Sequence, residues 1–269
     1  MKIGLYVPSW PPGSSANGIV TYASQLVPAL RRLGHEVFLL TAHYAKSDYD
    51  PYVTDLRNFL PKRSLWNRLT WRIAPETTLF NTSSLAISNA VSYLTAKQGL
   101  DVFEIDEAFG WSLPISRLRR LPILVRLHGP WFLNGRFGRY AKREAKNRRR
   151  AEREGEAIQN AQFVTASSEA VLTAVKEYYG LDLTASCVIH NPLETLAQTD
   201  TWSIETCDTN KLLFIGRFDN LKGGDLVLHA FADLAKANPQ LSLTFVGPDV
   251  GVTTSDGKMQ RFEHFVRTN

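Results

Sequence analysis

Two cations and three glycines lie close together late in the chain, where they could bind an anion. Arg217 follows Gly216, and Lys222 precedes Gly223-Gly224. Glycine lets the backbone approach a ligand closely, and the first N–H groups of a helix have no partner within that helix. A phosphate or diphosphate could accept hydrogen bonds from such N–H groups while both cations neutralise its charge. The alternative is an ordinary strand–turn–helix in which Lys222 is merely solvated.

The flanking segments predict the elements that would position these residues. Leu212 to Ile215 is a short apolar run, typical of a buried strand in a parallel sheet, and a helical run begins near Lys222 and extends to residue 237. A further strand is expected at Leu241 to Val246, followed by a final helix around Lys258 to Arg267. The sequence therefore predicts one β–α–β unit in this region.

Ile215-Gly216-Arg217-Phe218 and Lys222-Gly223 together resemble a segment of retaining glycosyltransferases with the GT-B fold, of the family 4 type. The resemblance implies that Arg217 and Lys222 contact the diphosphate of a nucleotide sugar donor, with Gly216 and Gly223 in the same site. It also implies that the two cations stabilise the departing diphosphate in place of a metal, so that no cofactor is required.

The N-terminal segment resembles the first unit of the same family. Lys2 to Val7 predicts a strand, the run after Gly18 a helix, and His35 to Leu40 a second strand. Family members usually carry Gly-Gly where this chain has Asn17-Gly18. Because Asn tolerates left-handed backbone conformations, we expect a tight turn that faces the donor here as well. The pattern is not the G-x-G-x-x-G of dinucleotide-binding folds.

His128 is the candidate catalytic residue. The apolar run Leu121 to Leu127 ends in His128-Gly129-Pro130, which resembles a strand-terminal motif whose histidine faces the reacting sugar. Open α/β sheets bind ligands beyond the carboxyl ends of their strands, where sequence order places His128. The resemblance implies a polar contact or stabilisation of transition-state charge rather than a general base. An ordinary loop histidine is the alternative.

Two later segments complete the family's order. Gln162 to Val164 predicts a strand, and Ser167 could cap the helix that follows it. Cys187 to Glu194 resembles the segment that closes the first domain. The expected fold class is α/β: a Rossmann-like acceptor domain (1–192), a linker (193–210) and the start of a second Rossmann-like domain for the nucleotide sugar (211–269), with the reaction in the cleft between them.

The predicted second domain lacks a feature that the resemblance requires. The family's complete domain carries an E-x7-E pair that holds the donor, whereas Glu263 is the only glutamate after Gly247. Two functions stay open. One is a hexosyltransferase that moves a sugar from a nucleotide diphosphate sugar to a saccharide or lipid-linked acceptor with retention. The other is a non-catalytic remnant or subunit that binds an acceptor or membrane surface and needs a complementing chain.

Composition indicates a soluble globular protein, because 44% hydrophobic residues in a chain of 269 permit a proper core. Cys187 and Cys207 form no ligand spacing with the six histidines, so we expect no metal site. A reducing cytoplasm is the simplest setting, since no signal peptide or membrane-spanning segment is expected.

Positive charge is concentrated in two segments. Arg136 to Arg153 holds nine Lys/Arg against two Glu, and Arg57 to Arg72 holds five with no acidic residue. The second also contains Trp66 and Trp71, a composition typical of contact with anionic lipid. We therefore expect peripheral association with the inner face of the membrane, with a solvated helix face and core tryptophans as the alternative. No nucleic-acid motif accompanies the charge, so nucleic acid is not an expected partner.

Overall fold

The computed structural model describes residues 1–45, 49–61, 72–118, 120–135, 144–195 and 202–268. The chain divides into two compact units. One comprises Met1–Trp131 and Arg148–Glu194, and the other Phe132–Asn147 and Thr195–Asn269. Residues 62–71 and 136–143, the centres of the two basic segments, lie outside the described residues.

The first unit is built on a seven-stranded parallel sheet in the order β3-β2-β1-β4-β5-β6-β7. The strands are β1 (Lys2–Val7), β2 (Glu36–Thr41), β3 (Val53–Asp55), β4 (Val102–Asp106), β5 (Ile123–Leu127), β6 (Phe163–Ala166) and β7 (Ser186–Val188). The strand predicted to begin at His35 begins at Glu36, and the one predicted to begin at Leu121 begins at Ile123. Sequence reasoning made no prediction for β4, which lies beside β1 and completes the centre of the sheet. The result is a Rossmann-like α/β fold.

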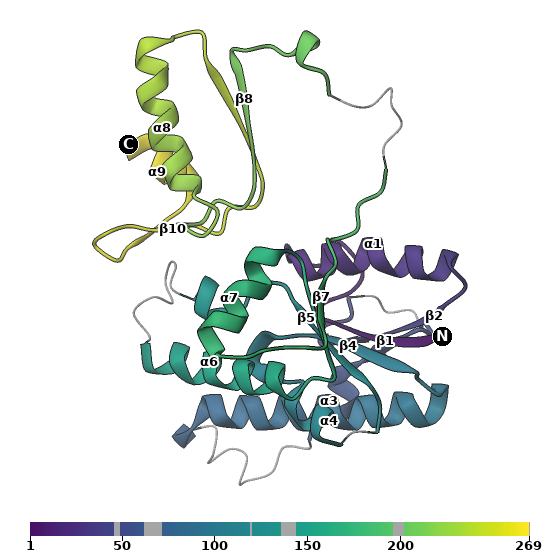
Figure 1. The fold of residues 1–269 in the computed structure, drawn as a ribbon. Coiled ribbons are helices and arrows are strands. Elements are labelled where there is room, and N and C mark those ends of the chain that lie inside the picture. The colour runs from purple at the N-terminus through teal and green to yellow at the C-terminus, as the bar shows by residue number, and fades with distance from the viewer. Residues whose placement is uncertain (46–48, 62–71, 119, 136–143, 196–201, 269) are drawn as a thin grey trace. The chain divides into compact units, whose positions relative to one another are not determined.

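Helices cover both faces of this sheet. In Figure 1, α1 (Gly18–Arg32) lies on one face, while α3 (Pro75–Gln98) and α4 (Leu113–Leu118) lie on the opposite face. The helices between β5 and β7 in the chain are α5 (Trp131–Asn134), α6 (Glu144–Gln159) and α7 (Glu169–Tyr179). Short 3-10 turns are η1 (Leu56–Phe59) and η2 (Ala108–Gly110). Within the described residues, no helix combines the length and apolar character needed to cross a bilayer.

The core between α1 and the sheet follows from strands that are apolar on both faces. Leu5 and Val7 of β1 pack with Val37 and Leu39 of β2 and with apolar residues of α1. Parallel strands covered by helices on both faces bury nearly every side chain, so their sequences read as continuous apolar runs. This packing fixes where each strand ends and which side chains follow it.

The cap of α7 differs from the prediction. Ser168, not Ser167, is the N-cap: its Oγ accepts the N–H of Val171 at 3.3 Å, from an extended backbone. The reason is that β6 continues to Ala166, so the turn into the helix comes one residue later. An N-cap side chain bonds to the N–H two or three residues ahead, which is the spacing that Ser168 provides.

The second unit has a small parallel sheet of its own. β8 (Lys211–Ile215) pairs with β9 (Ser242–Val246) in parallel, and α8 (Gly224–Ala237) connects them. A hairpin of β10 (Val252–Thr253) and β11 (Met259–Gln260) follows, and then α9 (Phe262–Thr268). The prediction of a helix from Lys258 was wrong at its start, because Met259 and Gln260 pair with β10. Phe218, Val252 and Phe265 form the core of this unit.

Candidate functional site

The carboxyl ends of β4 and β5 carry two polar residues of the candidate site. β1 and β4 are neighbours at the point where the strand order changes direction, which is where open α/β sheets usually bind ligands. Glu107 follows β4, and His128 follows β5. The structure therefore places His128 at the edge where a ligand is expected.

Two buried carboxylates hold the loops at this edge. Glu107 accepts the N–H groups of His128 at 3.0 Å and Gly129 at 2.8 Å, one on each oxygen. Glu154 of α6 accepts the N–H of Phe109 at 3.0 Å and that of Trp131 at 2.7 Å. Since buried N–H groups must find partners, these two side chains determine the paths of both loops. Sequence reasoning missed both; a carboxylate directly after a buried strand, as in Asp106-Glu107, is the signal that could have indicated one of them.

Burial sets the protonation of this cluster. It raises the pKa of Asp106 to about 8, with a further contribution from the charge of Glu107, and raises the pKa of Glu107 to about 7. Burial also raises the pKa of Glu154, against the opposing effect of Arg150. Desolvation disfavours the charged form of a carboxyl group, which is why all three shift in the same direction.

His128 is neutral near pH 7. Burial, followed by the charge of Arg126, lowers its pKa to about 4. Its ring packs edge-on against Tyr22 of α1, with 4.9 Å between the ring centres. A neutral imidazole offers one donor and one acceptor nitrogen, which suits a polar contact with a hydroxyl group.

Tyr22 belongs to a second buried network. Its hydroxyl donates to Glu104 at 2.8 Å, and the Arg126 guanidinium lies 4.9 Å from the centre of its ring. Arg126 also donates to the backbone oxygen of Ile189 at 2.7 Å and to Oδ1 of Asn191 at 2.9 Å. This arginine thereby connects α1, β5 and the segment after β7 beside His128.

Phe109 is held in a conformation that bulky residues rarely adopt. Its φ is +61°, in the left-handed region. Its ring stacks on Trp111 at 4.6 Å, and the guanidinium of Arg150 lies 3.6 Å from its centre. Arg150 also bonds to Glu154 at 2.8 Å. Arg150, one of the predicted lipid-facing cations, is therefore engaged within the first unit.

Asn17 and Gly18 form the start of α1. Asn17 is extended (φ −130°) rather than left-handed, so the expected tight turn is not formed there. Its Oδ1 accepts the N–H of Ile19 at 2.8 Å, because an N-cap asparagine takes an extended backbone to reach the first turn. A Cβ added at Gly18 would meet no atom within 4 Å, so the surface there is open. Tyr22, in the same helix, connects this region with His128.

The remaining predicted residues lie in the second unit, around Asp219. Arg217 pairs with Asp219, with 2.9 Å between Nε and Oδ2, and the backbone N–H of Lys222 donates to Oδ1 at 2.8 Å. Gly223 is the N-cap of α8 and is left-handed (φ +70°), which favours glycine. Gly216 donates its N–H to Val246 at 2.9 Å. Asp219, which sequence reasoning did not identify, thus orders the turn that carries both cations.

Among the described residues, no group of three histidine, cysteine, aspartate or glutamate side chains is arranged to hold a metal ion. The side chain of Lys222 makes no ion pair with the part of the chain that the structure describes. What the turn offers an anion is therefore a cationic side chain beside the start of a helix.

Comparison with solved structures shows the fold. Sucrose-phosphate synthase from Thermosynechococcus elongatus matches with a TM-score of 0.65 and 21% identity, over 95% of this chain and 64% of that one. WaaG, a glycosyltransferase involved in lipopolysaccharide biosynthesis, matches with a TM-score of 0.59 and 12% identity, over 99% of this chain and 66% of that one. Os79 from O. sativa, in complex with UDP, matches with a TM-score of 0.51 and 12% identity, over 92% of this chain and 67% of that one. The chain thus spans about two thirds of the length of each of these proteins.

No curated protein matches the sequence. The sequence model for Glycosyltransferase Family 4 matches residues 16–195. This range contains the start of α1, the carboxylate-held loops and His128, and it covers about two thirds of the chain. Its agreement with the Rossmann-like first unit and with the GT-B neighbours leads to one conclusion: the chain belongs to Glycosyltransferase Family 4.

Proposed function

We propose that this protein acts in the transfer of a hexose, with retention, from a nucleotide diphosphate sugar to a saccharide or lipid-linked acceptor. Family membership supports glycosyl transfer, and Os79 binds UDP. The observation that carries the proposal is the turn in the second unit, where Asp219 holds Arg217 and the backbone of Lys222 at the start of α8.

In this proposal, each unit has a separate task. Arg217, Lys222 and the N–H groups after Gly223 neutralise the diphosphate as it departs, without a metal or other cofactor. In the first unit, Gly18 gives a ligand close access to the backbone, and neutral His128 forms a hydrogen bond with a sugar hydroxyl. Glu107 already holds the backbone of His128 through a hydrogen bond, so a ligand does not have to order this residue when it binds.

A second candidate is a non-catalytic subunit that requires further polypeptide to complete its donor site. The observation that favours it is exposed apolar surface in the second unit: Leu213 is 63% and Ile215 75% exposed, although both belong to a strand. Apolar residues of a parallel strand are normally covered on both faces. A complementing chain or segment that supplies more strands would cover them.

We also propose that the protein acts in the cytoplasm and associates peripherally with anionic membrane through Arg57–Arg72 and Arg136–Arg153. Several of the described cations are already engaged within the first unit: Arg57 pairs with Asp55, Arg148 with Glu152 and Arg150 with Glu154, and Arg153 lies 4.4 Å from the ring of Phe80. Sedimentation with phosphatidylglycerol vesicles, but not with phosphatidylcholine vesicles, is the expected result, and equal sedimentation with both would contradict it.

A thermal melt with UDP-, GDP- and ADP-sugars tests the donor part of the proposal. A ligand at about 100 times its dissociation constant stabilises the folded state by about 2.7 kcal/mol. For a chain of this size the midpoint should rise by several degrees. A rise with one nucleotide base supports the first candidate and identifies the donor class. A cooperative melt that no nucleotide shifts favours the second.

A further inference from the structure

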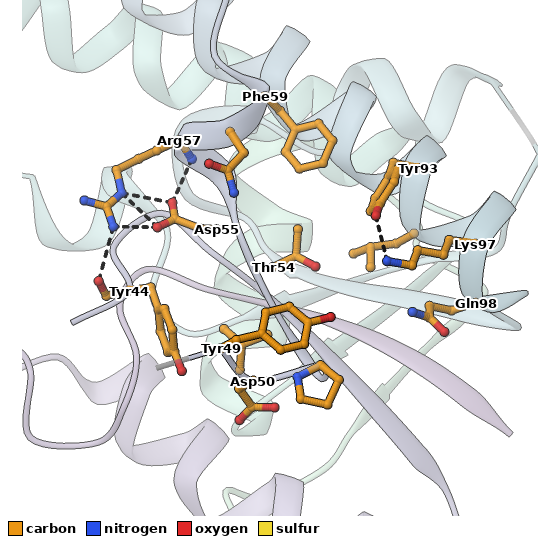
Figure 2. Close-up of a pocket in the computed structure, with 14 residues that line it drawn as sticks. Tyr44, Tyr49, Asp50, Thr54, Asp55, Arg57, Phe59, Tyr93, Lys97 and Gln98 are labelled. Carbon is orange, nitrogen blue, oxygen red and sulfur yellow. Dashed lines mark hydrogen bonds and ion pairs between the residues drawn. The ribbon is translucent and has the colours of Figure 1, made fainter. Parts of the chain in front are cut away.

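A pocket of about 470 Å³ opens beside β3 and the last turns of α3, at the edge of the first sheet. Figure 2 shows it lined by four aromatic side chains from three parts of the chain. They are Tyr44 and Tyr49 after β2, Phe59 of η1 and Tyr93 of α3. None of the residues that form the candidate site above lines this pocket.

The aromatic rings leave apolar faces accessible. Tyr49 is 83% exposed and Tyr93 is 44% exposed, so both rings are accessible to a ligand from solvent. Phe59 and Tyr93 pack together with 5.4 Å between their ring centres, and in Figure 2 they lie across the pocket from Tyr44 and Tyr49. Such rings offer a flat apolar surface to the C–H groups of a ligand, together with a polar hydroxyl at the edge.

Amide side chains supply hydrogen-bonding capacity. Asn58 and Gln98 line the pocket, and neither side chain is hydrogen-bonded to the part of the chain that the structure describes. Each amide can donate and accept at once. This combination complements hydroxyl groups, which also do both.

The charges of the pocket cancel. Arg57 forms a pair with Asp55, in which Nε lies 2.9 Å from Oδ2 and Nη2 lies 2.5 Å from the same oxygen. Lys97 donates to the hydroxyl of Tyr93 at 2.8 Å, and Asp50 supplies the second negative charge. A phosphate group would find no excess of positive charge here. The pocket therefore favours a neutral ligand that is rich in hydroxyl groups.

The pocket also adjoins the loop that leads into α1. Trp10, in this loop, forms a bridge with Tyr44: its N–H donates to His43 at 2.9 Å, and its carbonyl accepts the N–H of Ala45 at 2.8 Å. The same loop ends at the N-cap Asn17. Tyr44, which lines the pocket, is thus linked through Trp10 to the loop that precedes α1.

From aromatic faces, unengaged amides and balanced charge, we propose that this pocket binds a neutral saccharide and serves as a subsite for sugar units of the acceptor. The binding stands on the pocket alone, whereas its acceptor role rests on the proposed glycosyl transfer.

Saturation-transfer difference NMR on the full chain tests the binding. The probes are maltose, lactose, cellobiose and sucrose, with glucose 6-phosphate as the anionic comparison and no nucleotide present. We expect at least one neutral disaccharide to bind with a millimolar dissociation constant. Tyr49→Ala, which removes an exposed ring, should weaken that binding about tenfold. Gln98→Ala should weaken it as well. Tyr178→Ala is the matched control, because Tyr178 is 56% exposed on α7 and does not line the pocket.

The absence of signal from every neutral disaccharide would overturn the proposal, as would stronger binding of glucose 6-phosphate or an equal loss in Tyr178→Ala. A thermal melt of each variant shows whether it is folded. If Tyr49→Ala does not fold, Gln98→Ala still tests whether the pocket binds the disaccharide. Donor binding is measured separately with nucleotides, so failure of the saccharide subsite and failure of the proposed transfer give different results.

Discussion

The carboxylate of Glu107 binds the backbone of His128: Oε2 accepts the N–H of His128 at 3.0 Å, and Oε1 accepts that of Gly129 at 2.8 Å. Glu107 follows β4 and His128 follows the neighbouring strand β5. The histidine that the sequence singles out is thus positioned by a carboxylate that follows the adjacent strand. Its location depends on this buried contact as much as on its own strand.

Glu107→Gln should destabilise the protein by about 1–3 kcal/mol, because an amide has only one oxygen and leaves one of the two buried N–H groups without an acceptor. Urea unfolding measures the loss, and hydrogen exchange at His128 and Gly129 should become faster. Glu152→Gln on α6 is the control, since that side chain is 64% exposed. Equal effects of the two substitutions would show that Glu107 does not hold this loop.

Stability should fall as pH rises above 6.5. The folded protein retains protons on Asp106 (pKa about 8) and Glu107 (pKa about 7) that the unfolded chain has already lost, so the free energy of unfolding decreases with pH in this range. His128, with its pKa lowered to about 4, has the opposite effect, mainly below its ordinary value of 6.5 and only weakly above it. Between pH 6.5 and 8 the two carboxyl groups dominate over His128, and we expect a loss of about 2 kcal/mol.

Urea unfolding at several pH values checks this dependence. Asp106→Asn keeps an oxygen that can accept the N–H of Ala108 but removes the titrating group. The variant should therefore lose most of the pH dependence. A wild-type stability that is flat or rises over this range would contradict the protonated state assigned to Asp106.

Lys222→Ala should weaken the binding of UDP or another nucleotide diphosphate about tenfold, a change of about 1.4 kcal/mol. The remaining affinity should depend less on salt, because one ionic contact is lost. Isothermal titration calorimetry at two salt concentrations measures both effects. Lys236→Ala is the matched control on α8, where Lys236 pairs with Asp233 at 2.9 Å. If both variants bind as wild type does, Lys222 is only a solvated lysine.

Gly247→Ala should disrupt the second unit. A Cβ at this position would lie 1.9 Å from the backbone oxygen of Gly216, and the φ of +151° is itself strained for other residues. The expected loss is at least about 2 kcal/mol, detected by faster hydrogen exchange in β8 and β9. Gly18→Ala, which meets no atom within 4 Å, should leave stability unchanged or slightly higher. Tolerance of alanine at position 247 would mean that β8 and β9 are not fixed at this turn.

Much of the fold could be predicted because it is encoded locally. The strands at Lys2–Val7 and Lys211–Ile215 are apolar runs. Helix α1 follows a loop rich in proline and serine, and α8 follows a turn that contains Gly216 and Gly223. Hydrophobic patterns and turn-forming residues act over a few positions, so they can be recognised in a single sequence. The same locality let the family resemblance be recognised from short segments, and it identified His128 as a strand-terminal residue.

Errors of one or a few residues came from pairing between segments. Ser168 replaces Ser167 as the cap because β6 pairs with β5 as far as Ala166. Similarly, α9 begins at Phe262 because Met259 and Gln260 pair with β10. The ends of helices and strands depend on pairing with segments that are distant in the sequence, and the hydrophobic periodicity of one segment carries no information about that pairing.

The sequence by itself determined the α/β class and the family, and it predicted which residues could bind a diphosphate. Only the tertiary structure decided how the loops around His128 are held. Glu107 reaches His128 across 21 positions, Glu154 reaches Phe109 across 45, and Arg126 reaches Asn191 across 65. The physical reason is that a buried N–H group must find an acceptor wherever folding brings one, and a parallel sheet brings together strand ends that are far apart in the chain.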